Sequence, residues 1–294
     1  MFAPSIPGRV RVNAQRANAC SPAASRAVAL REGAFTLLEL LIVVGIVAIL
    51  MVLIAPAFTT IKGGTDVTSA AYTIKGVLDT ARTYAKANNT YTWVGFYEED
   101  VSQPSVIPAP DPQCTGCVGR LVMSVVASKD GTNVYGSTGA ATIDATRLTQ
   151  VGKLIKIENV HVPLFALGTG STGDTFDARP SPSPASDANN SRFGELNAAS
   201  PNTAPLTTPH NFQYPVASPA PAAQYTFSRL LEFTPRGESR VIGDSAIRRV
   251  VEIGLIQTHG NVAPTPTPSA GNYVGNVVAV QINGFAGDVR IYRR

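Results

Sequence analysis

Residues 35–58 read FTLLELLIVVGIVAILMVLIAPAF, and this stretch decides what kind of fold the chain can adopt. It contains a single charged residue, Glu39. As a helix it would extend about 36 Å, which is more than the hydrocarbon core of a bilayer at about 30 Å. It is also longer than the apolar core of an ordinary secretory signal, which has about 7–15 residues. The stretch therefore predicts a membrane-spanning helix.

The positive charge of the chain is concentrated before this stretch. Residues 1–34 contain five arginines and one acidic residue, whereas residues 35–294 contain 19 basic and 19 acidic side chains. Because basic flanks stay on the cytoplasmic side, we expect a cytoplasmic leader, a single-pass helix in the inner membrane and a periplasmic C-terminal domain. The neutral remainder of the chain gives no indication of a nucleic-acid partner.

Glu39 is the unusual residue of the apolar stretch. An acidic side chain costs about 2.5–3.5 kcal/mol at the centre of a membrane helix, so a carboxylate there indicates a function. The alternative is that Glu39, one turn inside the stretch, reaches the interface with water and has no role.

Residues 33–44, GAFTLLELLIVV, closely resemble the prepilin motif of type IV pilins and type II secretion pseudopilins. The resemblance implies cleavage by a prepilin peptidase and N-methylation of the new first residue. It further implies that the amine of this residue pairs with Glu39 of a neighbouring subunit during assembly. A buried carboxylate is tolerable when a partner cation neutralises it, which agrees with that implication.

The cleavage position departs from the family pattern by one residue. In the family a Gly precedes the cut, Phe comes first and Glu is fifth, but here Ala34 separates Gly33 from Phe35. Family members usually carry a Pro at mature position 22, and Pro56 has that position when Phe35 is counted as the first residue. We therefore expect cleavage after Ala34, N-methylation of Phe35 and an assembly role for Pro56. Cleavage after Gly33 is the alternative.

Three other interpretations of the N-terminal region stay open. Ala55-Pro56-Ala57 satisfies the A-x-A rule, so a signal peptidase would release the remainder of the chain. The helix would otherwise be an ordinary single-pass anchor without an assembly role. The leader of residues 1–34 is long, and translation starting at a later codon would shorten it.

The helical pattern continues beyond the apolar stretch. Apolar residues recur at helical spacing from Val67 to Ala85 with polar residues interleaved, which predicts an amphipathic helix over residues 65–88. Gly63-Gly64 is expected to loosen the helix, and Asn88-Asn89 to end it. We therefore expect an N-terminal helix over residues 35–89, with residues 35–58 in the membrane.

Beyond residue 90 the pattern changes to runs of β-branched and aromatic residues, which predict strands. These runs are Tyr91–Tyr97, Arg120–Ala127, Lys153–Val162, Tyr225–Phe233, Ile247–Gln257, Tyr273–Ile282 and Val289–Tyr292. We expect an α+β, pilin-like fold, with the long N-terminal helix packed on an antiparallel β-sheet domain over residues 90–294. Residues 166–223, rich in Pro, Ser and Gly, are expected to form an exposed or disordered insertion.

Cys114 and Cys117 stand alone in a Pro-rich loop. Two thiols with no histidine nearby cannot complete a zinc site, and a strand–helix context for a redox motif is missing. We expect a disulfide between them, as is usual in an oxidising compartment. Free thiols are the main alternative.

The C-terminal part weakly resembles minor pseudopilins of the GspH/FimT type. Leu231–Gly237 is similar to their strand followed by a Phe, Pro and Gly turn, and Gly284–Tyr292 to their closing turn and strand. Some FimT-like minor pilins use basic residues near the C-terminus for DNA uptake. An alternative function is therefore DNA binding through Arg290, Arg293 and Arg294, with Tyr292 stacking on a base.

Nothing in the sequence indicates an enzyme. His161, His210 and His259 lack ligand spacing, and the acidic run Glu98-Glu99-Asp100 is expected to be a solvated turn, with a metal site as the weaker alternative. We expect no cofactor and no metal. The favoured function is a minor pilin or pseudopilin whose partners are prepilin peptidase, other subunits and the inner membrane, with incorporation into an extracellular fibre.

Overall fold

The structure is a computed structural model, and it describes eleven segments of the chain. These are residues 36–102, 118–134, 145–170, 175–182, 192–194, 196, 211–216, 224–227, 229–242, 246–262 and 275–294, without the side chains of residues 52–66. The chain divides into two compact units, Met1–Val52 and Leu53–Arg294.

Helix α1 spans Leu37–Ala87 and crosses the boundary between the two units. It runs through Gly63-Gly64, where the sequence predicted a weaker helix. The helix ends at Asn88-Asn89 as predicted, because Asn89 takes a left-handed φ of 48° and the Thr90 amide donates to the Ala85 carbonyl at 3.0 Å.

The larger unit is built on a ten-stranded sheet, with strand order β12-β11-β10-β4-β2-β1-β8-β9 and β3 and β5 attached to β2 and β10. All of its pairings are antiparallel except that of β5 with β10. A second sheet pairs β6 with β7. The strands are β1 (Thr92–Asp100), β2 (Gly119–Ser128), β3 (Leu148–Gln150), β4 (Ile155–His161), β5 (Arg192–Phe193), β6 (Phe212–Tyr214), β7 (Tyr225–Phe227), β8 (Arg229–Phe233), β9 (Ser239–Val241), β10 (Val250–Gln257), β11 (Val277–Asn283) and β12 (Val289–Arg293), and a 3-10 turn, η1 (Ala145–Arg147), precedes β3.

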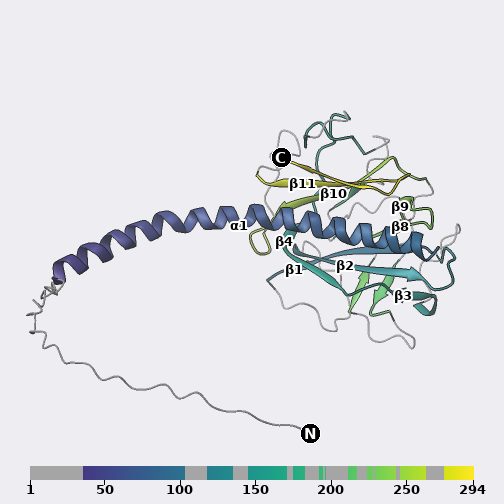
Figure 1. The fold of residues 1–294 in the computed structure, drawn as a ribbon, viewed down its shortest axis with the longest axis horizontal. Coiled ribbons are helices and arrows are strands. Elements are labelled where there is room, and N and C mark those ends of the chain that lie inside the picture. Colours follow the sequence, from purple (N-terminus) through teal and green to yellow (C-terminus); the bar gives the residue numbers. More distant parts are fainter. Residues whose placement is uncertain are drawn as a thin grey trace, which may run out of the picture. The chain divides into compact units, whose positions relative to one another are not determined.

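The main core lies between the sheet and the second half of α1. Buried apolar residues of α1 from Val67 to Ala85 form one cluster with residues of β1, β2, β8, β10, β11 and β12. Figure 1 shows β10 and β11 on one side of this part of α1 and β1 and β2 on the other. The sheet therefore curves around the helix, and both ends of the strand order contribute to one core.

A second core covers the opposite face of β1 and β2. Trp93, Val122 and Val126 pack there against Phe212 and Phe227 of the small sheet. Gly95 makes this approach possible, because a Cβ at Gly95 would lie 2.6 Å from the Cβ of Phe227. The two-sided burial explains why β1 and β2 are buried along nearly their whole length.

The structure contradicts the expected fold class. The described chain is mainly a large, mostly antiparallel β-sheet of ten strands, and not a long membrane-spanning helix packed on a smaller sheet domain. Among the described residues, no helix combines the length and the apolarity needed to cross a membrane. The expected transmembrane helix over 35–58 is therefore wrong, and so is the single-pass placement in the inner membrane with a periplasmic domain.

The strand predictions were better than the prediction of the fold class. Each of the seven predicted ranges overlaps observed strands, with residues 225–233 divided into β7 and β8. The sheet is larger than predicted because β3, β5 and β9 are strands of two or three residues in polar segments without a visible period. Such short strands are ordered by their partners and not by their own sequence.

Two polar regions are also more buried than predicted. Glu98-Glu99 lies inside β1 and not in a solvated turn, and the two side chains are 0% and 4% exposed. In the insertion of residues 166–223, the described Phe176, Arg179 and Phe212 are buried. These three side chains are therefore not exposed as predicted, whereas other described residues of the insertion, such as Leu167 and Asp177, are exposed.

Candidate assembly site

The first turn of α1 is closed by reciprocal hydrogen bonds between Thr36 and Glu39. Thr36 Oγ1 accepts from the Glu39 amide at 3.2 Å, while Glu39 Oε2 accepts from the Thr36 amide at 3.0 Å and from its hydroxyl at 3.1 Å. This is a capping box, the arrangement that T-x-x-E forms at a helix start. The pattern Thr36-Leu37-Leu38-Glu39 carries the signal for this cap, whereas Glu39 taken alone indicates only a charge in an apolar stretch.

The capping box also sets the charge state of Glu39. The hydrogen bond from the Thr36 amide, and then the one from its hydroxyl, lower the pKa of the Glu39 carboxyl below its ordinary value. Both bonds use Oε2, and Oε1 accepts no hydrogen bond from the described part of the chain. Glu39 is therefore ionised at neutral pH, held in one orientation, and has an oxygen open to a further donor.

Glu39 stands at the start of an unusual surface. We call residues Leu37–Met51 of α1 the apolar arm, and its large side chains are 43–82% exposed. They are Leu37, Leu38, Leu40, Leu41, Ile42, Val43, Val44, Ile46, Val47, Ile49, Leu50 and Met51. Glu39 is the single charged residue among them. Exposed apolar surface of this extent marks an interaction site.

Several residues predicted from the sequence lie outside what the structure describes. Gly33, Ala34 and Phe35 of the processing site precede the first described residue, and Cys114 and Cys117 fall between described segments. Pro56 is within α1, but its side chain is not described. Cleavage, N-methylation and the disulfide therefore stay predictions.

The three C-terminal arginines do not form one basic surface. Side chains alternate along a strand, so Arg290 and Arg293 point to opposite faces of β12, and Arg294, directly after the strand, continues on the side of Arg290. Arg290 Nε is 3.5 Å from Asp288 Oδ2, and Arg294 Nη2 is 2.7 Å from Asp177 Oδ1. Because Arg293 points away from the other two and Arg294 is held by Asp177, the three arginines do not act as one set on a nucleic-acid backbone.

Buried contacts of carboxylates with His161, Arg120 and Lys156 inside the sheet carry no local signal in the sequence. His161 Nδ1 lies 2.7 Å from Glu98 Oε1 on the helix side of the sheet. On the other side, Glu99 Oε1 lies 3.2 Å from Arg120 Nη1 and 3.8 Å from Lys156 Nζ. These carboxylates are neighbours in sequence but point to opposite faces of β1, so they do not form an acid pair for catalysis or metal binding.

A third buried pair fixes the described part of the insertion. Arg179 Nε lies 2.7 Å from Glu252 Oε2 of β10, and its guanidinium also donates to the carbonyls of Phe176 and Ala166. Gln281 of β11 donates to Glu252 at 2.7 Å. The guanidinium of Arg179 therefore holds this segment on the sheet, and the Pro180 carbonyl adds a contact by accepting from Gln281 at 2.8 Å.

Comparison with known proteins adds no assignment. No family model, curated protein or solved structure matches this chain. In the part of the chain that the structure describes, no group of three or more His, Cys, Asp or Glu side chains is placed to hold a metal ion.

Proposed function

We propose that this chain is a structural subunit, a minor pilin or pseudopilin of a type IV pilus or a type II secretion-like pseudopilus. In this proposal prepilin peptidase removes the leader, and the subunit assembles through its apolar arm. The observation that carries the proposal is the arm itself: a helix start with apolar side chains exposed on all sides and one oriented carboxylate at its first turn.

Exposing the large apolar side chains of the arm to water is unfavourable, and this supports the proposal that the arm is covered by other subunits on assembly. Full burial of one large apolar side chain stabilises by about 1.5–3 kcal/mol. The large side chains of the arm are 43–82% exposed, so most of this stabilisation is still to be gained. Matching arms of neighbouring subunits would cover one another, and such helices pack through rows of side chains three and four residues apart.

Glu39 supports a defined register in that packing. A carboxylate surrounded by apolar arms must be neutralised, and the amine of a neighbouring first residue is a cation at the same height of the helix. Oε1 is the open oxygen for this contact, since Oε2 is used by the capping box. The proposed cut after Ala34 would place that amine on Phe35, directly before Thr36.

The test compares two substitutions of Glu39 in cells that carry a prepilin peptidase and a pilus assembly system. A glutamine keeps the capping box, because Gln also satisfies the T-x-x-E/Q pattern, but it removes the charge. We expect Glu39→Gln and Glu39→Ala to be cleaved normally, with Phe35 first in N-terminal sequencing, and to be absent from sheared fibres. Thr36→Ser, which keeps the hydroxyl, is the control and should enter fibres.

The outcomes separate the parts of the proposal. Normal incorporation of Glu39→Gln together with loss of Glu39→Ala would assign Glu39 to the helix cap and refute the charge pairing. Absence of the unsubstituted chain from fibres, in a system that assembles its own subunits, would refute the proposed function.

A further inference from the structure

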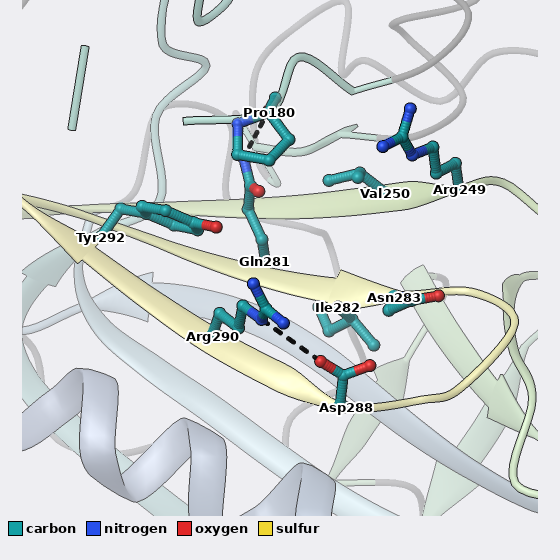
Figure 2. Close-up of a pocket in the computed structure, with 9 residues that line it drawn as sticks. All are labelled: Pro180, Arg249, Val250, Gln281, Ile282, Asn283, Asp288, Arg290 and Tyr292. Carbon is teal, nitrogen blue, oxygen red and sulfur yellow. Dashed lines mark hydrogen bonds and ion pairs between the residues drawn. The ribbon is translucent and has the colours of Figure 1, made fainter. Parts of the chain in front are cut away.

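A cavity of about 190 Å³ lies where the segment around Pro180 meets β10, β11 and β12 (Figure 2). Arg249 lines it beside the start of β10, Asn283 at the end of β11, Asp288 directly before β12 and Arg290 within β12. Sites for drug-sized ligands occupy about 300–1,000 Å³, so this cavity fits a group of the size of a small ion.

Hydrogen-bond donors dominate the rim of the cavity. The Arg249 side chain is exposed and makes no hydrogen bond or ion pair with the described residues. Asn283 Oδ1 accepts from the amides of Phe285 and Ala286, at 3.0 and 3.2 Å, so the amide group of Asn283 is fixed with Nδ2 as an available donor. Nδ2 makes no hydrogen bond with any described residue.

The balance of charge in the cavity is positive. Arg249 and Arg290 contribute two cations, and Asp288, which lies 3.5 Å from Arg290, is the one acidic residue of the lining. Figure 2 shows Arg290 of β12 beside Asp288, which directly precedes that strand, with Arg249 on the opposite rim. Glu252 below this face is already paired with Arg179 and Gln281 and does not change the balance.

We propose that this cavity binds one phosphate-type oxyanion, as free phosphate or as the monoester group of a larger ligand. The forked guanidinium of arginine matches phosphate geometry and is fully charged at neutral pH. A phosphate offers oxygens in several directions, which suits donors that come from three different strands. The proposal involves neither the apolar arm nor Glu39 and is independent of assembly.

The test is isothermal titration of the full chain, kept in solution with a mild detergent, at pH 7 and constant ionic strength. Inorganic phosphate and glycerol 3-phosphate are the two probes. We expect saturable binding and a loss of about ten-fold or more in affinity for Arg249→Gln and Arg290→Gln, as for a charge-assisted hydrogen bond. Arg294→Gln, on the same face but paired with Asp177 outside the lining, should bind like the unsubstituted chain.

A variant that binds phosphate more tightly than the unsubstituted chain must be folded, so it serves as a control for variants that lose binding by failing to fold. Asp288→Asn removes the one acidic residue of the lining and should strengthen phosphate binding several-fold. Tighter binding of glycerol 3-phosphate than of phosphate identifies a monoester ligand, and the reverse order identifies free phosphate. No saturable binding of either probe, or equal affinity in Arg249→Gln and the unsubstituted chain, would overturn the proposal.

Discussion

Glu39 Oε2 lies 3.0 Å from the amide nitrogen of Thr36, and this contact ties the one charge of the apolar arm to the start of its own helix. The carboxylate therefore has an intramolecular partner before any neighbouring subunit is present. A role in the helix cap and a role in assembly are compatible, because the first uses Oε2 and the second would use Oε1.

The capping box predicts an acid-sensitive helix start. The pKa of Glu39 is lowered in the folded chain, so its contribution to stability is present above the ordinary pKa of 4.5 and is lost as the pH falls through the lowered pKa. We expect the carboxyl ¹³C resonance of Glu39 to titrate with a midpoint below 4.5. Thr36→Val should move the midpoint back toward the ordinary value, and Thr36→Ser should not. A midpoint that is the same in all three chains would show that the capping box does not form in solution.

Whether a contact can be predicted from the sequence depends on how many positions separate its two residues along the chain. The capping box joins residues three positions apart, so the pattern T-x-x-E was sufficient to predict it. The pairing of Glu98 with His161 joins residues 63 positions apart, and neither position carries a local signal. Acidic residues in a row are most often solvated, and only the partner strands make burial acceptable here.

His161 and Glu98 provide a test of that long-range pairing. Their atoms are 2.7 Å apart, and the two side chains are 6% and 1% exposed. Removing one member of a buried pair leaves the other without compensation, which typically costs 3–5 kcal/mol. We therefore expect His161→Leu to lower the free energy of unfolding by about 3–5 kcal/mol in chemical denaturation. The double variant His161→Leu/Glu98→Leu should recover part of the loss, and a double variant no more stable than the single one would contradict the coupling.

Alanine substitutions at two glycines are expected to change stability in opposite directions, because the surroundings of the two glycines differ. A Cβ at Gly95 would lie 2.6 Å from Phe227 and 2.9 Å from Phe212, whereas a Cβ at Gly76, in α1, would meet nothing within 4 Å. We expect Gly95→Ala to destabilise by about 1–3 kcal/mol through overpacking. Gly76→Ala should stabilise by about 1 kcal/mol, because alanine is the better helix former. Thermal unfolding of both variants is the measurement, and equal effects of the two would contradict the close packing of the small sheet on β1.

The same distinction applies to the fold, where some features follow from the local sequence and others depend on contacts between distant segments. Long strands such as β2 and β10 carry their own β-branched pattern and were predicted within a few residues. The curvature of the sheet around α1 and the small sheet over Gly95 depend on contacts between distant segments.

Arg229 is the residue whose burial has the least explanation in the fold. It lies in β8 opposite Phe96, is 6% exposed, and its Nε and Nη2 have no hydrogen-bond partner in the described structure. Burial lowers the pKa of its guanidinium to about 10. Below about pH 10 the guanidinium is charged, and burying this charge lowers the stability of the folded chain. The loss of stability becomes smaller only as the pH rises from about 10 toward the ordinary pKa of 12.5.

Replacing this cation by an apolar side chain of similar length should therefore stabilise the protein. A buried donor without a partner costs about 1–3 kcal/mol, and we expect Arg229→Met to raise the free energy of unfolding by about that amount at pH 7. Arg240→Met is the matched control, because Arg240 Nε lies 2.7 Å from the fully buried Glu232 and its loss leaves that carboxylate without its cation. Urea denaturation should show the two variants shifting in opposite directions. A destabilised Arg229→Met would contradict the cost assigned to this buried guanidinium.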